Sequence, residues 1–214
     1  DLDGNSSGRI ALTTSNLLSS GGNITLGGGA DPLTGSAFGV AGAVEGINLN
    51  ASTLNAAGGT ISLLGRGYAG TTSNYGILMQ AAAKAQTSGN GTVTMSGTSG
   101  AGTNTNYALY LTGAGTAISS VDGAISLTGT AQGSGSSNSG IVMGAAATVS
   151  ASGTGTVSLT GQASTGTSSN RGIYLTGANT AVSSVNGNVT LTGQGAGTTT
   201  SNEGIYLDTG ATVA

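Results

Sequence analysis

The sequence predicts an all-β fold, a parallel right-handed β-helix (β-solenoid) with about 32 residues per rung and roughly seven rungs. Three observations carry this prediction. Two short motifs recur at a constant spacing, apolar residues alternate with polar ones inside each motif, and glycine-rich turns separate the motifs.

The first motif is Gly/Ala-Ile/Leu-x-Leu/Met, and its copies follow one another at a constant interval of about 32 residues, which lies in the range of known repeat folds. The regular copies start at Gly76, Ala108, Gly140, Gly172 and Gly204. An earlier copy at Gly46 precedes Gly76 by slightly less than this interval. Fixed self-similarity of this length is the signature of a stacked repeat fold.

The second motif is Gly-x-Ile/Val-Ser/Thr-Leu/Met, with an earlier copy at Gly22. We interpret residues 8–12 (Gly-Arg-Ile-Ala-Leu) as one further copy. The regular copies start at Gly59, Gly91, Gly123, Gly155 and Gly187. A weaker third segment, at 116–121 and 180–185, recurs after two intervals with a different copy between them at 148–152, so two rung subtypes are expected to alternate.

Alternation with a period of two indicates strands with one buried face. In residues 173–175, for example, Ile173 and Leu175 flank Tyr174. One unit cannot bury its apolar face alone, but stacked units can, with like residues in columns about 4.8 Å apart. Long rungs and the usual hand of parallel crossovers favour a right-handed coil over a left-handed solenoid or a flattened two-faced coil.

The chain is expected to form a single solenoid over residues 1–214. Residues 1–45 would make irregular rungs with a longer loop, and residues 46–214 the regular repeats. Because the chain starts without Met and stops inside a repeat, we expect it to be a fragment of a longer fibre.

Two further columns, one of asparagines and one of glycines, are predicted to hold the register. Asparagines recur at the same interval and would either hydrogen-bond up the axis or serve as left-handed turn residues: Asn74, Asn106, Asn138, Asn170 and Asn202. A glycine corner at Gly65, Gly97, Gly129, Gly161 and Gly193 needs either positive φ or close backbone approach. One position after the asparagine column, Arg171 and Glu203 are expected to form an ion pair between rungs.

Composition argues against several function classes. The chain has no Cys and no His, which disfavours thiolate or zinc sites, and we expect no metal or cofactor. Four basic residues are too few to track a nucleic-acid backbone, and no apolar stretch is long enough to span a membrane. The acids are scattered, with only Glu203 and Asp208 near each other, so we expect no enzyme.

The outward residues of the second motif form a strip rich in hydroxyl groups. It is a candidate surface for ice or glycans, although Ser and Thr are also simply tolerated on a solvated strand. Its threonines are Thr92, Thr94, Thr128, Thr156, Thr160, Thr190 and Thr192. Stacked tyrosines beside such a strip would hold a sugar or pack along the rung edge: Tyr75 and Tyr107 in one column, and Tyr110, Tyr174 and Tyr206 in another.

Residues 21–32 (Gly-Gly-Asn-Ile-Thr-Leu-Gly-Gly-Gly-Ala-Asp-Pro) resemble a segment of large exoproteins of the filamentous-haemagglutinin type. The tandem Gly-Ile-Tyr-Leu and Gly-Asn-Val-Thr-Leu-Thr-Gly units are similar to the repeats of those proteins over nearly the whole chain. The resemblance implies export by a two-partner or related pathway, a right-handed β-helical shaft, and a role in adhesion or matrix.

The sequence thus predicts the structural shaft of a secreted or cell-surface bacterial fibre or adhesin. Its main partner would be itself, through a continuous-chain or end-to-end fibre with lateral bundling, and glycans or a neighbouring cell surface are further candidates. The alternative is an ice- or glycan-binding solenoid that uses its flat Ser/Thr face.

Overall fold

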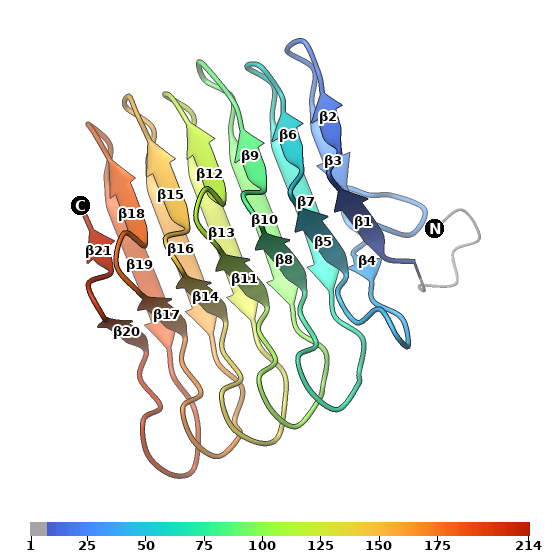
Figure 1. Cartoon of the computed structure of the whole chain (residues 1–214), viewed down its shortest axis with the longest axis vertical. Coiled ribbons are helices and arrows are strands. Elements are labelled where there is room, and N and C mark those ends of the chain that lie inside the picture. The colour runs from blue at the N-terminus through green and yellow to red at the C-terminus, as the bar shows by residue number, and fades with distance from the viewer. Residues whose placement is uncertain (1–7) are drawn as a thin grey trace.

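The computed structural model describes residues 8–214, which form a coil of parallel strands without α-helix in that range (Figure 1). The strands fall into three sheets that run the length of the coil, as the repeat predicts. The flattened two-faced coil considered from the sequence is therefore wrong, because each regular rung contributes one strand to each of three sheets.

Sheet 1 contains the first motif and has seven strands: β1 (Ile10–Thr13), β5 (Ile47–Asn50), β8 (Ile77–Gln80), β11 (Leu109–Thr112), β14 (Ile141–Gly144), β17 (Ile173–Thr176) and β20 (Ile205–Asp208). Sheet 2 contains the weaker third segment: β2 (Asn16–Leu18), β6 (Thr53–Asn55), β9 (Lys84–Gln86), β12 (Ala117–Ser120), β15 (Thr148–Ala151), β18 (Ala181–Ser184) and β21 (Thr212–Val213). Sheet 3 contains the second motif: β3 (Ile24–Leu26), β4 (Ala37–Phe38), β7 (Ile61–Arg66), β10 (Val93–Thr98), β13 (Ile125–Thr130), β16 (Val157–Gln162) and β19 (Val189–Gln194).

The coil is right-handed. In Figure 1 the chain advances from the N-terminal side on the right to the C-terminal side on the left. It rises through sheets 1 and 2 in front, turns over at the top and descends behind through sheet 3. A long corner, such as residues 99–108, then leads back to sheet 1.

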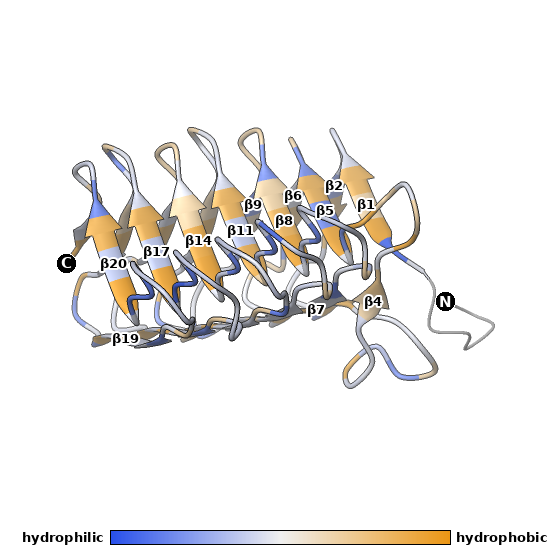
Figure 2. Ribbon diagram, turned by 90° about the horizontal axis from the view of Figure 1, so that it is seen from below, coloured by the Kyte–Doolittle hydropathy of each residue, from blue (hydrophilic) through white to orange (hydrophobic). Residues whose placement is uncertain are grey.

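The core is a set of apolar columns. In sheet 1, Leu109 pairs with Ile77 and Ile141, and Ile141 pairs with Ile173, so neighbouring copies of the motif occupy neighbouring positions. In sheet 3, Leu127 pairs with Met95 in the same way. These inward side chains are fully buried. Figure 2 shows the resulting apolar bands at matching places on successive strands.

The first rungs differ from the prediction. Residues 8–12 are not a copy of the second motif, because Ile10 and Leu12 pair with Ile47 and Leu49 in sheet 1. Both motifs contain Ile-x-Leu, so the apolar pattern alone does not separate them. The expected longer loop is present, since the first strand of sheet 3 is split into β3 and β4, which both pair with β7. Residues 27–36 form the excursion between them.

The two rung subtypes differ in the corner between sheets 1 and 2. From β8 onward, sheets 1 and 3 keep one constant offset between successive strands. The offset in sheet 2 is alternately one position longer, as from Lys84 to Ala117, and one shorter, as from Ala117 to Thr148. The corners at 81–83 and 145–147 are the shorter type and have two successive alanines at positive φ. The corners at 113–116 and 177–180 are one position longer and begin with a glycine at positive φ.

The last rung leaves core residues uncovered. Ile205 and Leu207 belong to the inward columns of sheet 1 but are 40% and 39% exposed, because β20 is the edge strand of this sheet in residues 8–214. Separately, the described residues include no helix of the length and apolarity that a membrane crossing requires.

Candidate functional site

The predicted asparagine column is a hydrogen-bonded ladder in the long corner just before sheet 1. The Nδ2 atom of Asn74 donates to Oδ1 of Asn106, and Nδ2 of Asn106 donates to Oδ1 of Asn138, both at 2.7 Å. The same Oδ1 atoms also accept from the backbone N–H of the preceding ladder residue, at 3.2 and 3.1 Å. Asn138 donates to Oδ1 of Asn170 through its backbone N–H, at 2.9 Å, while its Nδ2 donates to the carbonyl of Thr103. Asn170 donates to Oδ1 of Asn202 through both its backbone N–H and its Nδ2, at 3.0 and 3.4 Å. Consecutive ladder residues therefore bond to one another from rung to rung.

The ladder residues are not the left-handed residues of the turn. Positive φ falls on the residue immediately before each asparagine: Ser73, Thr105, Ser137, Ser169 and Ser201, with φ between 54° and 60°. Asn74, Asn106, Asn138 and Asn170 are completely buried and take the axial bonds instead. Of the two roles considered for this column, the structure supports the hydrogen-bonding one.

The glycine corner of sheet 3 is explained by close backbone approach. Gly129 and its equivalents are absent from the residues with positive φ. A Cβ atom on Gly129 would lie 2.2 Å from the carbonyl oxygen of Gly140, where sheet 1 begins. Any larger residue would push sheets 1 and 3 apart at this point.

The Ser/Thr strip lies on the outer face of sheet 3. Thr94, Thr128, Thr156, Thr160, Thr190 and Thr192 are exposed, whereas Thr92 is half-buried. Thr128, Thr160 and Thr192 are in register on three successive strands. The neighbouring column alternates less regularly, with Thr94, Ser126, Ser158 and Thr190. The result is a flat, uncharged hydroxyl surface without a single uniform column over all five rungs.

The tyrosines lie on the outer side of sheet 1 and its leading corner, not beside the Ser/Thr strip. Tyr75 and Tyr107 stack at a centroid distance of 5.6 Å, and Tyr110 lies 5.3 and 5.2 Å from them. Tyr174 and Tyr206 stack at 5.5 Å. A sugar stacks on an open ring face, but these rings mostly face one another. This geometry favours packing along the rung edge over sugar binding.

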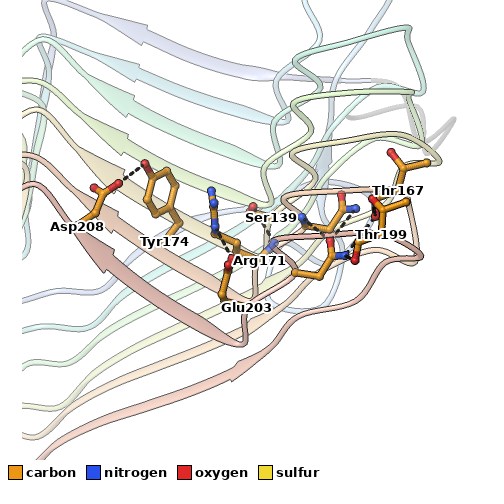
Figure 3. A network of polar contacts seen from close by, with 9 residues as sticks. Ser139, Thr167, Arg171, Tyr174, Thr199, Glu203 and Asp208 are labelled. Atoms are coloured by element: carbon orange, nitrogen blue, oxygen red, sulfur yellow. Dashed lines mark hydrogen bonds and ion pairs between the residues drawn. The ribbon is translucent and has the colours of Figure 1, made fainter.

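Arg171 centres a second cluster (Figure 3). Its guanidinium carbon lies 4.6 and 4.4 Å from the ring centroids of Tyr174 and Tyr206, and its Nε donates to Glu203 at 2.8 Å, which is the predicted ion pair. The hydroxyl of Tyr174 donates to Asp208 at 3.1 Å. The pKa of Asp208 is lowered, chiefly by a hydrogen bond from Thr176. A second ion pair, Arg9–Glu45, was not expected from the sequence.

Burial affects the first tyrosine cluster. It raises the pKa of Tyr107 to about 12 and raises that of Tyr75 as well. Both phenols are therefore neutral over the physiological range, and their surroundings favour packing over ionisation.

The two carboxylates singled out in the sequence each bind a neighbouring side chain. Glu203 is paired with Arg171, and Asp208 accepts from Tyr174. Residues 8–214 contain no group of three or more His, Cys, Asp or Glu side chains that could hold a metal ion, and that range contains no pocket.

Asp31, in the excursion of residues 27–36, has a turn-forming role. Its Oδ1 accepts the backbone N–H of Leu33 at 3.0 Å, and its Oδ2 accepts the Thr34 hydroxyl at 3.1 Å. Its own carbonyl accepts the N–H of Gly35 at 2.8 Å. This bonding closes the excursion that splits the first strand of sheet 3.

No family model, no curated protein and no solved structure matches the chain.

Proposed function

We propose that this chain is the structural shaft of a secreted or cell-surface bacterial fibre or adhesin, without catalytic activity. The observation that carries the proposal is the unbroken continuity of three sheets, the core columns and the asparagine ladder along one axis. A fold built this way adds length without altering its cross-section, because each rung contacts only its neighbours.

The direction of the buried hydrogen bonds supports a structural role along the axis. The buried asparagines bond to one another along the axis, and the outer surface carries few charges. These buried side-chain hydrogen bonds therefore run between rungs, the direction in which a fibre is extended. The resemblance of residues 21–32 to filamentous-haemagglutinin-type exoproteins agrees with export and an extracellular or cell-surface location.

The proposed partner of the shaft is the chain itself. The edge of a parallel sheet accepts a further strand, so rungs of the same chain or of another copy would continue the three sheets.

Electron microscopy of native material labelled with an antibody to this chain tests the proposal. We expect label along surface fibres whose diffraction has a meridional spacing of about 4.8 Å, the separation of strands that lie perpendicular to the fibre axis. Label confined to discrete soluble particles would contradict the shaft function.

The alternative function is binding of ice or glycans by the Ser/Thr strip, and the register of Thr128, Thr160 and Thr192 is the observation in its favour. A variant with Thr160→Lys places a long charged side chain at the centre of this column. If the chain shapes ice crystals or retains a polysaccharide, and Thr160→Lys abolishes that effect without unfolding, the strip is a binding surface. The shaft proposal expects neither activity.

A further inference from the structure

We propose that Tyr75, Tyr107 and Tyr110 form an oxidative cross-linking site, at which a dityrosine bond joins two neighbouring rungs. The proposal rests on the geometry of this cluster and is independent of the shaft function. It assigns a covalent modification to the outer side of sheet 1, for which the cluster otherwise has only a packing role.

The three rings are close enough to couple. Tyr75 and Tyr107 occupy equivalent positions on adjacent rungs, with centroids 5.6 Å apart and planes inclined by 21°. Tyr110 is on the same rung as Tyr107 and lies 5.3 Å from Tyr75. Backbone pairing holds the two rungs in register, since Leu109 pairs with Ile77. The rings of the two rungs therefore remain adjacent, and their coupling does not require an encounter between separate molecules.

The rings are also accessible to a small oxidant, since all three tyrosines are half-buried and none is enclosed in the core. The other pair, Tyr174 and Tyr206, has a similar spacing but lies under the Arg171 cation. A positive charge against both rings opposes the removal of an electron. The uncharged cluster of three is therefore the preferred site.

The reaction requires a peroxide as oxidant. Each of two phenols gives up one electron and one proton, which yields two phenoxyl radicals. The radicals couple through a C–C bond between ring carbons ortho to the hydroxyl groups, and the hydrogens on those carbons return to the oxygens as the rings become aromatic again. The two electrons and two protons reduce one hydrogen peroxide to two waters. The product has lost two hydrogen atoms and keeps both hydroxyl groups.

The distribution of basic residues allows a direct test. Cleavage after Arg66, Lys84 and Arg171 separates Tyr75, in peptide 67–84, from Tyr107 and Tyr110, in peptide 85–171. The folded chain is treated at low concentration with hydrogen peroxide and a haem peptide, and the monomer is isolated. It is then unfolded, digested with trypsin and analysed by mass spectrometry. We expect a species that joins peptides 67–84 and 85–171, with the mass of both less two hydrogens and with dityrosine fluorescence.

Variants identify the residue responsible, because peptide 67–84 also contains Tyr68. Tyr75→Phe keeps the aromatic ring but removes the phenol, and we expect it to eliminate the joined species. Tyr68→Phe is the matched control and should leave the species unchanged. Absence of the joined species from wild-type monomer would overturn the proposal. So would its persistence in Tyr75→Phe, or a link found only inside peptide 85–171.

Discussion

The asparagine ladder and the Ser/Thr strip are both polar columns that recur once per rung, but they differ in burial. The ladder lies in a corner and does not vary over five rungs, and each of its buried residues bonds to the next. The strip lies on the solvated face of sheet 3 and mixes Thr with Ser, Ala and Asn. Periodicity alone therefore does not identify structural importance. A repeated polar residue holds the stack together when water cannot replace its partner.

The largest loss of stability should come from a substitution at a fully buried position. Ile141→Asp puts an unpaired charge into the core column of β14, and we expect a loss of more than about 4 kcal/mol of unfolding free energy, or failure to fold. Thr160→Asp adds the same charge to the exposed strip and should cost less than about 1 kcal/mol. Denaturant unfolding of both variants measures the difference. Equal losses would mean that the two faces are misassigned.

A substitution in the asparagine ladder should cause the next largest loss of stability. Asn106→Leu removes the oxygen that accepts both the backbone N–H and the Nδ2 group of Asn74, which leaves two buried donors without partners. We expect a loss of about 2–4 kcal/mol, from about 1–3 kcal/mol for each unsatisfied group. Asn90→Leu, at an exposed turn position, is the control and should change stability by no more than about 0.5 kcal/mol. A ladder variant as stable as this control would show that the amide bonds do not support the stack.

Alkaline pH should reveal the partial burial of the Tyr107 phenol without a core mutation. Burial raises the pKa of Tyr107 from 10.0 to about 12, so the folded state holds this proton over a range in which the unfolded chain releases it. Its contribution to stability is complete below pH 10 and declines as the pH rises from 10 to about 12. The free energy of unfolding should fall less steeply across that pH range for Tyr107→Phe than for the wild-type chain. Spectrophotometric titration in which every native tyrosine ionises near pH 10 would contradict this account.

The smallest change in stability is expected from a substitution in the Ser/Thr strip. Thr160→Val removes a hydroxyl from an exposed strand position for which no hydrogen-bond partner is required, and valine is also a good strand former. We expect a change within about 0.5 kcal/mol by thermal unfolding. A loss comparable to that of Asn106→Leu would remove the distinction between the two columns.

The sequence predicted the regular rungs well because their register is repeated in every unit. The pairing of Ile141 with Ile173 and the bonds between Asn106 and Asn138 follow from the constant interval between copies. Prediction was poorer where two alternatives share one apolar pattern. Residues 8–12 fit the second motif by their glycine, but their Ile-x-Leu strand pairs in sheet 1, since only the neighbouring strand decides between the two.

The arrangement of the outer surface was harder to predict. The columns of Tyr75 and Tyr174 were evident from spacing, but the direction of their rings depends on local packing with Tyr110 and Arg171. The ion pair between Arg9 and Glu45 joins residues outside the regular repeat, and opposite charges just before Ile10 and Ile47 were its only signal. The alternating corner lengths were visible as two subtypes, but their assignment to sheet 2 required the structure.

The central claim is that every rung adds the same height to the coil, and a chain lengthened by two rungs tests this claim most directly. Residues 109–172, one pair of the alternating subtypes, are duplicated in tandem so that both corner types keep their order. Small-angle X-ray scattering should show the same cross-section and an axial dimension about 10 Å longer, two strand separations. An unchanged length, a wider cross-section or an unfolded chain would contradict the account.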